Sequence, residues 1–328
     1  MNALDQNDMT AAARAEAGRS LGYEMAVRGM QLGSGMPREV AEGYAEGKYS
    51  SRRAKAAPSA FVRKLMRLKV SAWKRGRYVD EAVTAEFLES IAVTHCPVTR
   101  VEMTSGTGTG TDMSVDRVFN GGAYAVGNIA FMSANANHAK GSLMPLEIVD
   151  VAKRAEEYDG LKPEQWLRLA CMTCQATPPG YPVSNLPMLV YPPNGLLISN
   201  GYVAIQQSLS LLAGGFIAGK WQGEFAGQAR GKKSKRTLKE LLEVLARTTR
   251  SALIGAKTDQ QRQFALCDAW LPPLVFDRYM AMVRELDIAE TNGLVVVAKR
   301  AMGSYKEMRA DELEAWGIER NGYVECRR

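Results

Sequence analysis

The sequence lacks a long hydrophobic run. Its most apolar stretch, residues 208–217, has about half of the roughly 18 residues that a membrane-spanning helix needs. The first ten residues contain two aspartates and no apolar segment, which is not the pattern of a secretory signal peptide. Cysteine is scarce as well, because five cysteines in 328 residues, an odd number, do not make a disulfide framework. Together these absences predict a cytoplasmic protein without a membrane attachment.

Acidic residues are absent from residues 48–79, although this segment carries eleven lysines and arginines. The formal net charge of the whole chain is only +7, so this one segment accounts for its basic character. A basic block of this size suits a polyanion such as nucleic acid. The alternative is a solvated helix face whose acidic partners lie elsewhere on the surface.

Within this block, the pattern of residues 61–74 predicts a basic amphipathic helix. Its apolar positions are Phe61, Leu65, Leu68 and Ala72, and the residues predicted to contact nucleic acid are Arg63, Lys64, Arg67, Lys74 and Arg75. Binding to a membrane surface is the other role of such a helix. We do not expect it, because the sequence has one strong helix of this kind and no lipidation motif.

Proline marks one boundary along the chain. Six of the thirteen prolines fall between residues 178 and 193, a composition that neither a helix nor a central strand tolerates. The predicted parts are a helical N-terminal region (1–79, with the basic helix at 61–77), a middle region (80–177, core 94–143), a Pro-rich connection (178–195) and a mainly helical C-terminal domain (196–328). Helices at 80–93, 146–158 and 163–174 should flank the core, and 294–297 should be the one strand of the last part.

The core of the middle region has the pattern of a β-hairpin followed by a helix. Residues 113–118 and 128–132 are predicted to be two short strands, and the Asn120-Gly121-Gly122 turn signal follows the first of them. Ser133 can cap a helix that runs to about Leu143. The fold class predicted from the sequence is therefore α+β and mostly α-helical, with a small ββα module between helical segments.

Several polar residues of this module should come together. Asn137 and Lys140 are three residues apart and share a face of the predicted helix. Asp116 lies on the first strand, from which it can face that helix. His138 is rotated by about 100° from Asn137 around the helix axis.

The motifs of this segment resemble the HNH, or ββα-metal (His-Me finger), endonucleases. They resemble in particular a branch that carries S-[VL]-D-R at the first strand, a tyrosine in the turn, G-N at the second strand and N-x-x-K-G on the helix. The matching residues are Ser114-Val115-Asp116-Arg117, Tyr124, Gly127-Asn128 and Asn137-His138-Ala139-Lys140-Gly141, preceded by Cys96-Pro97-Val98-Thr99. The resemblance covers about 48 of the 328 residues, and its five pieces stand in the right order and at the right spacing.

The resemblance implies a role for each matching residue. Asp116 would bind a divalent cation, and Asn137 would supply a second ligand, with His138 as the alternative. Asn128 would pin the hairpin loop and orient the general base. One carboxylate and an amide oxygen suit Mg²⁺ or Mn²⁺ better than Zn²⁺. Such an ion would polarise a scissile phosphate while a neutral histidine deprotonates water, which implies a metal-dependent DNA endonuclease or nickase.

Arg117 departs from the pattern of the family, whose general base is usually a histidine at this position. Arginine stays protonated at neutral pH, so it can hold a phosphate but cannot act as a base. The chain has two histidines, of which His138 is the better candidate for the base and His95 the other. Metal-bound water without a protein base is a further option. Lys140 is predicted to contact nucleic acid.

Arg117 therefore leaves a second hypothesis open, a catalytically inactive nucleic-acid-binding or regulatory protein that retains the HNH fold. A third hypothesis is an interaction protein that binds a protein partner through residues 196–328. No small-molecule cofactor is expected. The resemblance suggests a bacterial cell or a phage-infected host as the setting.

Three other features have ordinary explanations. The Gly-Thr loop at residues 105–112 lacks the Lys-Ser/Thr of a phosphate-binding loop and is predicted to be a flexible connection. Cys171 and Cys174 lack a second cysteine pair and are predicted to pack in a core. The basic cluster at residues 230–236 is predicted to be a solvated linker, or else a second phosphate contact.

Overall fold

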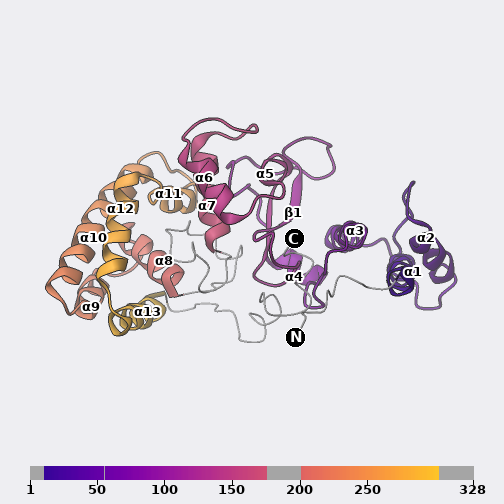
Figure 1. The fold of residues 1–328 in the computed structure, drawn as a ribbon, viewed down its shortest axis with the longest axis horizontal. Helices are drawn as coiled ribbons and strands as arrows, with labels where there is room; N and C mark the ends of the chain where they lie inside the picture. Colours follow the sequence, from indigo (N-terminus) through magenta and orange to yellow (C-terminus); the bar gives the residue numbers. More distant parts are fainter. Residues whose placement is uncertain (1–10, 55, 176–200, 303–328) are drawn as a thin grey trace, which may run out of the picture. The chain divides into compact units, whose positions relative to one another are not determined.

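The computed structural model describes residues 11–54, 56–175 and 201–302. The described chain is mostly helical, with thirteen α-helices and one two-stranded antiparallel sheet, so the predicted α+β, mainly α-helical class is confirmed (Figure 1). It forms two compact units, which are described one by one. Of the described residues, 11–54, 56–92 and 121–128 belong to the first unit, and 93–120, 129–175 and 201–302 belong to the second. None of the described helices is both long and apolar enough to cross a membrane.

The described part of the first unit contains four helices, which are α1 (Ala11–Val27), α2 (Arg38–Gly47), α3 (Ala60–Lys74) and α4 (Ala85–Ser90). Helices α1 and α2 touch through their backbones, because a Cβ atom on Gly22 would collide with the carbonyl of Val40. Helix α3 begins at Ser59, whose hydroxyl accepts a hydrogen bond from the amide of Val62 at 3.2 Å. The helix predicted at 80–93 is shorter, because Thr84 caps α4 and the helix ends at residue 90.

The second unit begins with the ββα segment and two further helices. Its elements are β1 (Met113–Arg117), β2 (Ile129–Ser133), α5 (Ala134–Lys140), α6 (Pro145–Lys153) and α7 (Pro163–Gln175). The strands are antiparallel, with Asp116 opposite Ala130. Ser133 caps α5, as its position in the sequence predicts. All five residues of β2 are buried, and the strands and helices enclose an apolar cluster that includes Val98, Ile148 and Trp166.

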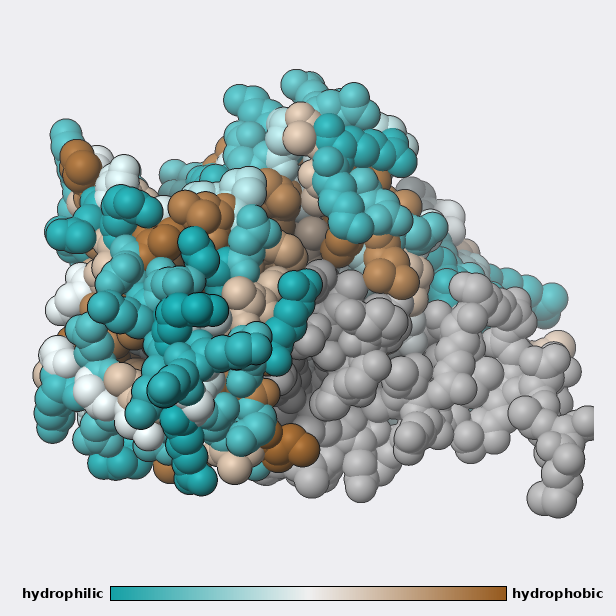
Figure 2. Space-filling model, turned by 60° about the vertical axis from the view of Figure 1, so that its left-hand side comes forward, coloured by the Kyte–Doolittle hydropathy of each residue, from teal (hydrophilic) through white to brown (hydrophobic). Residues whose placement is uncertain are grey.

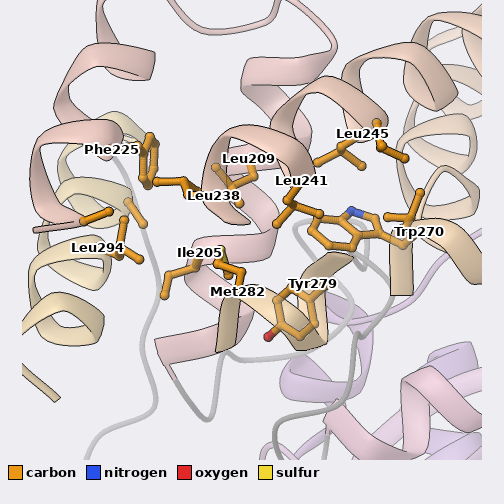
Figure 3. Packing of buried hydrophobic residues seen from close by; sticks show 14 of the residues in the cluster. Ile205, Leu209, Phe225, Leu238, Leu241, Leu245, Trp270, Tyr279, Met282 and Leu294 are labelled. Atoms are coloured by element: carbon orange, nitrogen blue, oxygen red, sulfur yellow. The ribbon is translucent and has the colours of Figure 1, made fainter. Parts of the chain in front are cut away.

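The C-terminal part of the second unit is an assembly of helices. They are α8 (Gly201–Ala213), α9 (Lys220–Gln228), α10 (Lys232–Leu253), α11 (Asp259–Asp268), α12 (Pro273–Glu285) and α13 (Ile288–Met302). Figure 3 shows how side chains from α8, α9, α10, α12 and α13 converge on one core, which includes Leu209, Phe225, Leu241, Tyr279 and Leu294. The predicted Pro-rich connection at 178–195 and the end of the predicted C-terminal domain, residues 303–328, lie outside the described residues.

Two sequence-based predictions for this part are wrong. Residues 294–297 form part of α13 rather than a strand, because Leu294, Val297 and Ala298 lie one helical turn apart and pack on the core. Packing on one helical face overrides the β preference of the consecutive valines. Residues 232–236 are the first turns of α10 and not a linker.

A polar joint links α11 to the ββα segment within the second unit. The carboxylate of Asp268 accepts hydrogen bonds from Arg168 at 2.8 and 3.0 Å and from Arg100 at 2.7 Å. The guanidinium of Arg100 also lies 4.0 Å from the ring centre of Phe264. Two arginines thus share one partly buried carboxylate, an arrangement with fixed geometry. This joint connects two regions that have separate apolar clusters.

A carboxylate from α13 caps the start of α10, which has no capping side chain of its own. Glu290 accepts hydrogen bonds from the amides of Arg230 and Gly231, from the hydroxyl of Ser234 at 2.8 Å, and from the amide of Asp287 at 3.0 Å. Although burial acts in the opposite direction, these donors lower the pKa of Glu290 to about 2. The negative charge also lies at the positive end of the α10 dipole.

We therefore expect Glu290→Gln to lower the free energy of unfolding by about 1 to 3 kcal/mol at pH 7, the value of hydrogen bonds to a charged group. The folded-state pKa of Glu290 is below its ordinary value of 4.5, so its stabilising effect is present above pH 4.5 and is lost toward pH 2. Urea unfolding at pH 7 and pH 3 measures the difference. Glu285→Gln, an exposed change at the end of α12, is the control. If Glu290→Gln lowered the free energy of unfolding equally at both pH values, the result would contradict a cap that depends on the charge of Glu290.

Candidate functional site

The ββα segment brings two of the predicted site residues into direct contact. The ammonium Nζ of Lys140, at the end of α5, lies 2.9 Å from Oδ2 of Asp116 in β1 and donates a hydrogen bond to the carbonyl of Arg117 at 2.8 Å. The side chain of Lys140 is fully buried, and that of Asp116 is 10% exposed. Lys140, which is predicted to contact nucleic acid, is therefore buried inside the protein in this structure.

Burial strongly affects this ion pair. Loss of water lowers the pKa of Lys140 from its ordinary value, although the charge of Asp116 acts in the opposite direction. Oδ2 of Asp116 is enclosed by protein and has no hydrogen-bond donor in favourable geometry. The positive charge of Lys140 is therefore what compensates this carboxylate oxygen.

Arg117 is also buried and acts within the segment. Its guanidinium donates a hydrogen bond to the carbonyl of Asn120 at 3.2 Å. The side-chain amide of Asn120 in turn donates to the carbonyls of Gly141 at 3.1 Å and Leu143 at 2.9 Å. These contacts tie the end of β1 to the chain that follows α5. Arg117 as a whole is only 7% exposed. The predicted phosphate contact would therefore require its guanidinium to become accessible.

The remaining predicted residues lie in different surroundings. The amide of Asn137 donates to the hydroxyl of Ser114 at 2.6 Å, a second link between α5 and β1. Asn128 is buried in the loop of the first unit, where its amide donates to the carbonyl of Ala123 at 2.8 Å. His138 is exposed on α5, whereas His95 is partly buried beside the ring of Phe264. Asp116, Asn137 and Lys140 therefore share the β1–α5 interface, and Asn128 holds its own loop.

The residues around Asp116, in the arrangement described, do not fit a divalent cation. The ammonium of Lys140 already supplies the positive charge beside its carboxylate. The described residues also contain no group of three His, Cys, Asp or Glu side chains that could hold an ion. A cation at Asp116 would have to displace a buried lysine, which would then lose its charge partner. The Mg²⁺ or Mn²⁺ site therefore stays a prediction.

The basic residues of α3 form a separate candidate surface in the first unit. Arg63, Arg67, Lys74 and Arg75 are exposed, whereas the opposite face of the helix is buried among apolar residues. Lys69 is the exception on this helix, because it pairs with Glu24 at 3.0 Å. Lys64, also predicted to contact nucleic acid, is partly buried.

The four exposed cations of α3 form no ion pair with any acid in the described part of the chain. Arg63 donates to the carbonyl of Pro58 at 2.6 Å, and Arg75 donates to the hydroxyl of Tyr124 at 2.8 Å. Both acceptors are neutral, so these bonds orient the guanidinium groups without cancelling their charge. Helix α3 and its C-terminal cap thus present an exposed positive face.

Sequence reasoning missed several residues that hold the site together. The Tyr124 hydroxyl binds Arg75, and its backbone pairs with Tyr78 and Asp80, but the sequence motif gives no partner for this tyrosine.

The Gly-Thr loop at residues 105–112 was expected to be a flexible connection. Its backbone is instead bound by the carboxylate of Asp112, which accepts from the amides of Thr107 and Gly108, and these bonds lower the pKa of Asp112 to about 2.

No protein-family model matches the chain, and no curated protein or solved structure is significantly similar to it. The likeness to the HNH endonucleases therefore depends on the motif residues and on the order of strands and helix.

The buried pair allows a direct test of its structural role. We expect Lys140→Met to lower the free energy of unfolding by about 3 to 5 kcal/mol, because it leaves the carboxylate of Asp116 buried without a compensating charge. Adding Asp116→Asn should restore part of this loss, and denaturant unfolding of both variants measures the coupling. Lys153→Met, at an exposed lysine of α6, is the control and should cost less than about 1 kcal/mol. Equal stability of the single and double variants would contradict the coupling.

Proposed function

We propose that the protein binds nucleic acid, and DNA in particular, through the basic face of α3. The observation that carries this proposal is the set of four exposed cations on α3 and its C-terminal cap residue Arg75, none of which is paired with an acid of the described chain. Phosphate contacts by lysine and arginine release counterions, and this supplies affinity that does not depend on sequence. We further propose that the ββα segment is an HNH-like scaffold in which Asp116 has a structural role.

The packing of α3 favours nucleic acid over a membrane surface. A helix that lies in a membrane buries its apolar face among lipids. The apolar residues of α3, such as Leu65, Met66 and Val70, are buried inside the first unit. Only the charged face of α3 is therefore available to a partner.

A second candidate function is a metal-dependent endonuclease or nickase. It is favoured by the position of Asp116 and Asn137 at one strand–helix interface, with the exposed His138 on the same helix. If Mg²⁺ or Mn²⁺ bound there, it would supply electrostatic stabilisation of a phosphate. For this candidate, Lys140 must leave Asp116 when the ion enters.

The binding proposal predicts a strong dependence on salt. We expect the combined change Arg63→Gln, Arg67→Gln and Lys74→Gln to weaken binding to a labelled 30-base-pair duplex by about tenfold or more. The slope of log K against log salt should fall in magnitude by about 2 to 3, because each lost contact contributes about 0.9. Fluorescence anisotropy between 50 and 300 mM salt measures both quantities.

The control for this experiment removes the same charge elsewhere, through Lys153→Gln, Lys257→Gln and Arg284→Gln. These residues are exposed and lie in the second unit. Unchanged binding by the α3 variant, or equal losses in both variants, would argue against a specific role for α3.

A plasmid assay separates the two candidates. If Asp116 is structural, neither the wild type nor Asp116→Asn should nick a supercoiled plasmid with Mg²⁺ or Mn²⁺, although the wild type binds it. Nicking by the wild type that disappears in Asp116→Asn, with duplex binding and folding retained, would favour the endonuclease. His138→Ala and His95→Ala would then locate the base.

A further inference from the structure

We infer that the outer face of α10, in the second unit, is another surface for the phosphodiester backbone of nucleic acid. The inference builds on the proposed nucleic-acid binding but uses none of the residues of α3. Its central observation is a straight row of side chains. The row consists of Lys232, Arg236, Lys239, Glu243, Arg247 and Arg250, all of which are exposed.

The spacing of these residues places them on a single line. They follow one another at intervals of three or four residues, which keeps them on one face of a helix with 3.6 residues per turn. From the first to the last, the row extends over roughly 27 Å at 1.5 Å per residue. Five of its six members are cations, so the row offers regularly spaced positive charge to a linear polyanion. Lys233 and Lys235, both exposed, widen its first end.

The acids of α10 neutralise little of this charge. Arg236 and Lys239 approach Glu240 and Glu243 only to 3.8 Å, and Glu240 has a closer partner in Arg278 at 2.7 Å. Exposed pairs of this length contribute little. Lys232 and Arg247 form no ion pair with an acid in the described ranges.

The position of the cations at the start of α10 opposes the helix dipole. Lysines and arginines destabilise the first turn of a helix, where acidic residues are preferred, and α10 has no acid in its first turn. The amides of Arg230 and Gly231 are already bound by Glu290. An anion at this end would therefore be held by the side chains of the row rather than by the helix terminus.

The row borders a hollow on the surface. Three cations, Lys239, Arg247 and Arg250, and one acid, Glu243, line it together with neutral residues such as Leu212, and its volume is about 810 Å³. Figure 2 turns the face of the C-terminal helices forward, and hydrophilic side chains cover most of it with apolar patches between them. A cationic rim beside a shallow hollow suits a nucleic-acid backbone that follows the groove.

A membrane fits this face less well. The other side of α10 is buried, because Leu238, Leu241 and Leu245 point into the core shown in Figure 3. The helix thus has no apolar face to insert among lipids. Anionic lipid remains an outcome that the experiment must distinguish.

The test compares triple variants of the full chain. Lys232→Gln, Arg236→Gln and Arg247→Gln remove three charges of the row, and Lys153→Gln, Lys257→Gln and Arg284→Gln form the matched control. We expect the first variant to bind a labelled 30-nucleotide single strand and its duplex about tenfold more weakly than the control, with a salt slope reduced by about 2 to 3. Circular dichroism melting checks that both variants are folded.

The pattern of losses separates this inference from the proposed role of α3. Weaker binding by the α10 variant supports the inference even if the α3 variant binds normally, which would overturn the α3 proposal alone. Normal binding by the α10 variant, together with a loss in the α3 variant, overturns the inference alone. Loss of binding to phosphatidylserine vesicles without loss of oligonucleotide binding would also overturn it, in favour of a membrane.

A second measurement does not depend on substitutions. Acetylation of the wild-type protein with and without the duplex, followed by mass spectrometry, reports the accessibility of Lys232, Lys235 and Lys239. We expect all three lysines to be protected by the duplex, whereas Lys257 should stay reactive. Equal reactivity with and without DNA would overturn the inference.

Discussion

The burial of one ammonium group determines the geometry of the ββα segment. Lys140 cannot remain charged inside the protein unless oxygen atoms surround it, and Asp116 and the carbonyl of Arg117 provide them. Both partners come from the end of β1, so the last turn of α5 is held against that strand. The links from Asn137 to Ser114 and from Asn120 to Gly141 are formed within the geometry that this contact imposes. The carboxylate of Asp116, which could otherwise bind a metal ion, is thereby paired with Lys140.

Local features of the segment could be predicted from the sequence, because they depend on neighbouring residues. The Asn-Gly-Gly turn indicated the hairpin, Ser133 indicated the start of α5, and the apolar spacing indicated α3. Contacts between distant residues could not be predicted in the same way. The motif places Asp116 and Lys140 in the right elements, but only the packing shows that the lysine is buried and that its charge is directed at the aspartate.

The wrong predictions have a common physical origin. The valines before Ala298 have a strand preference, yet in α13 Val297 packs on the core together with Leu294 and Ala298, and Val296 is exposed. The cations at 232–236 look like a solvated linker, because their charge opposes helix formation at a helix start. Glu290 supplies the missing cap from another helix, and no local pattern reveals such a partner. Tertiary contacts therefore determine the secondary structure of both segments, 294–297 and 232–236. In each, the local sequence preference opposes the helix that the structure contains.

The joint at Asp268 has a consequence for how such a chain can be assembled in evolution. The ββα segment and the C-terminal helices each enclose their own apolar cluster, and the contacts between Asp268, Arg100 and Arg168 are polar and few. The junction also contains Phe264 of α11, whose ring lies beside Arg100 and His95. Recombination can therefore exchange either part for a different one, provided that this small set of side chains and contacts is kept.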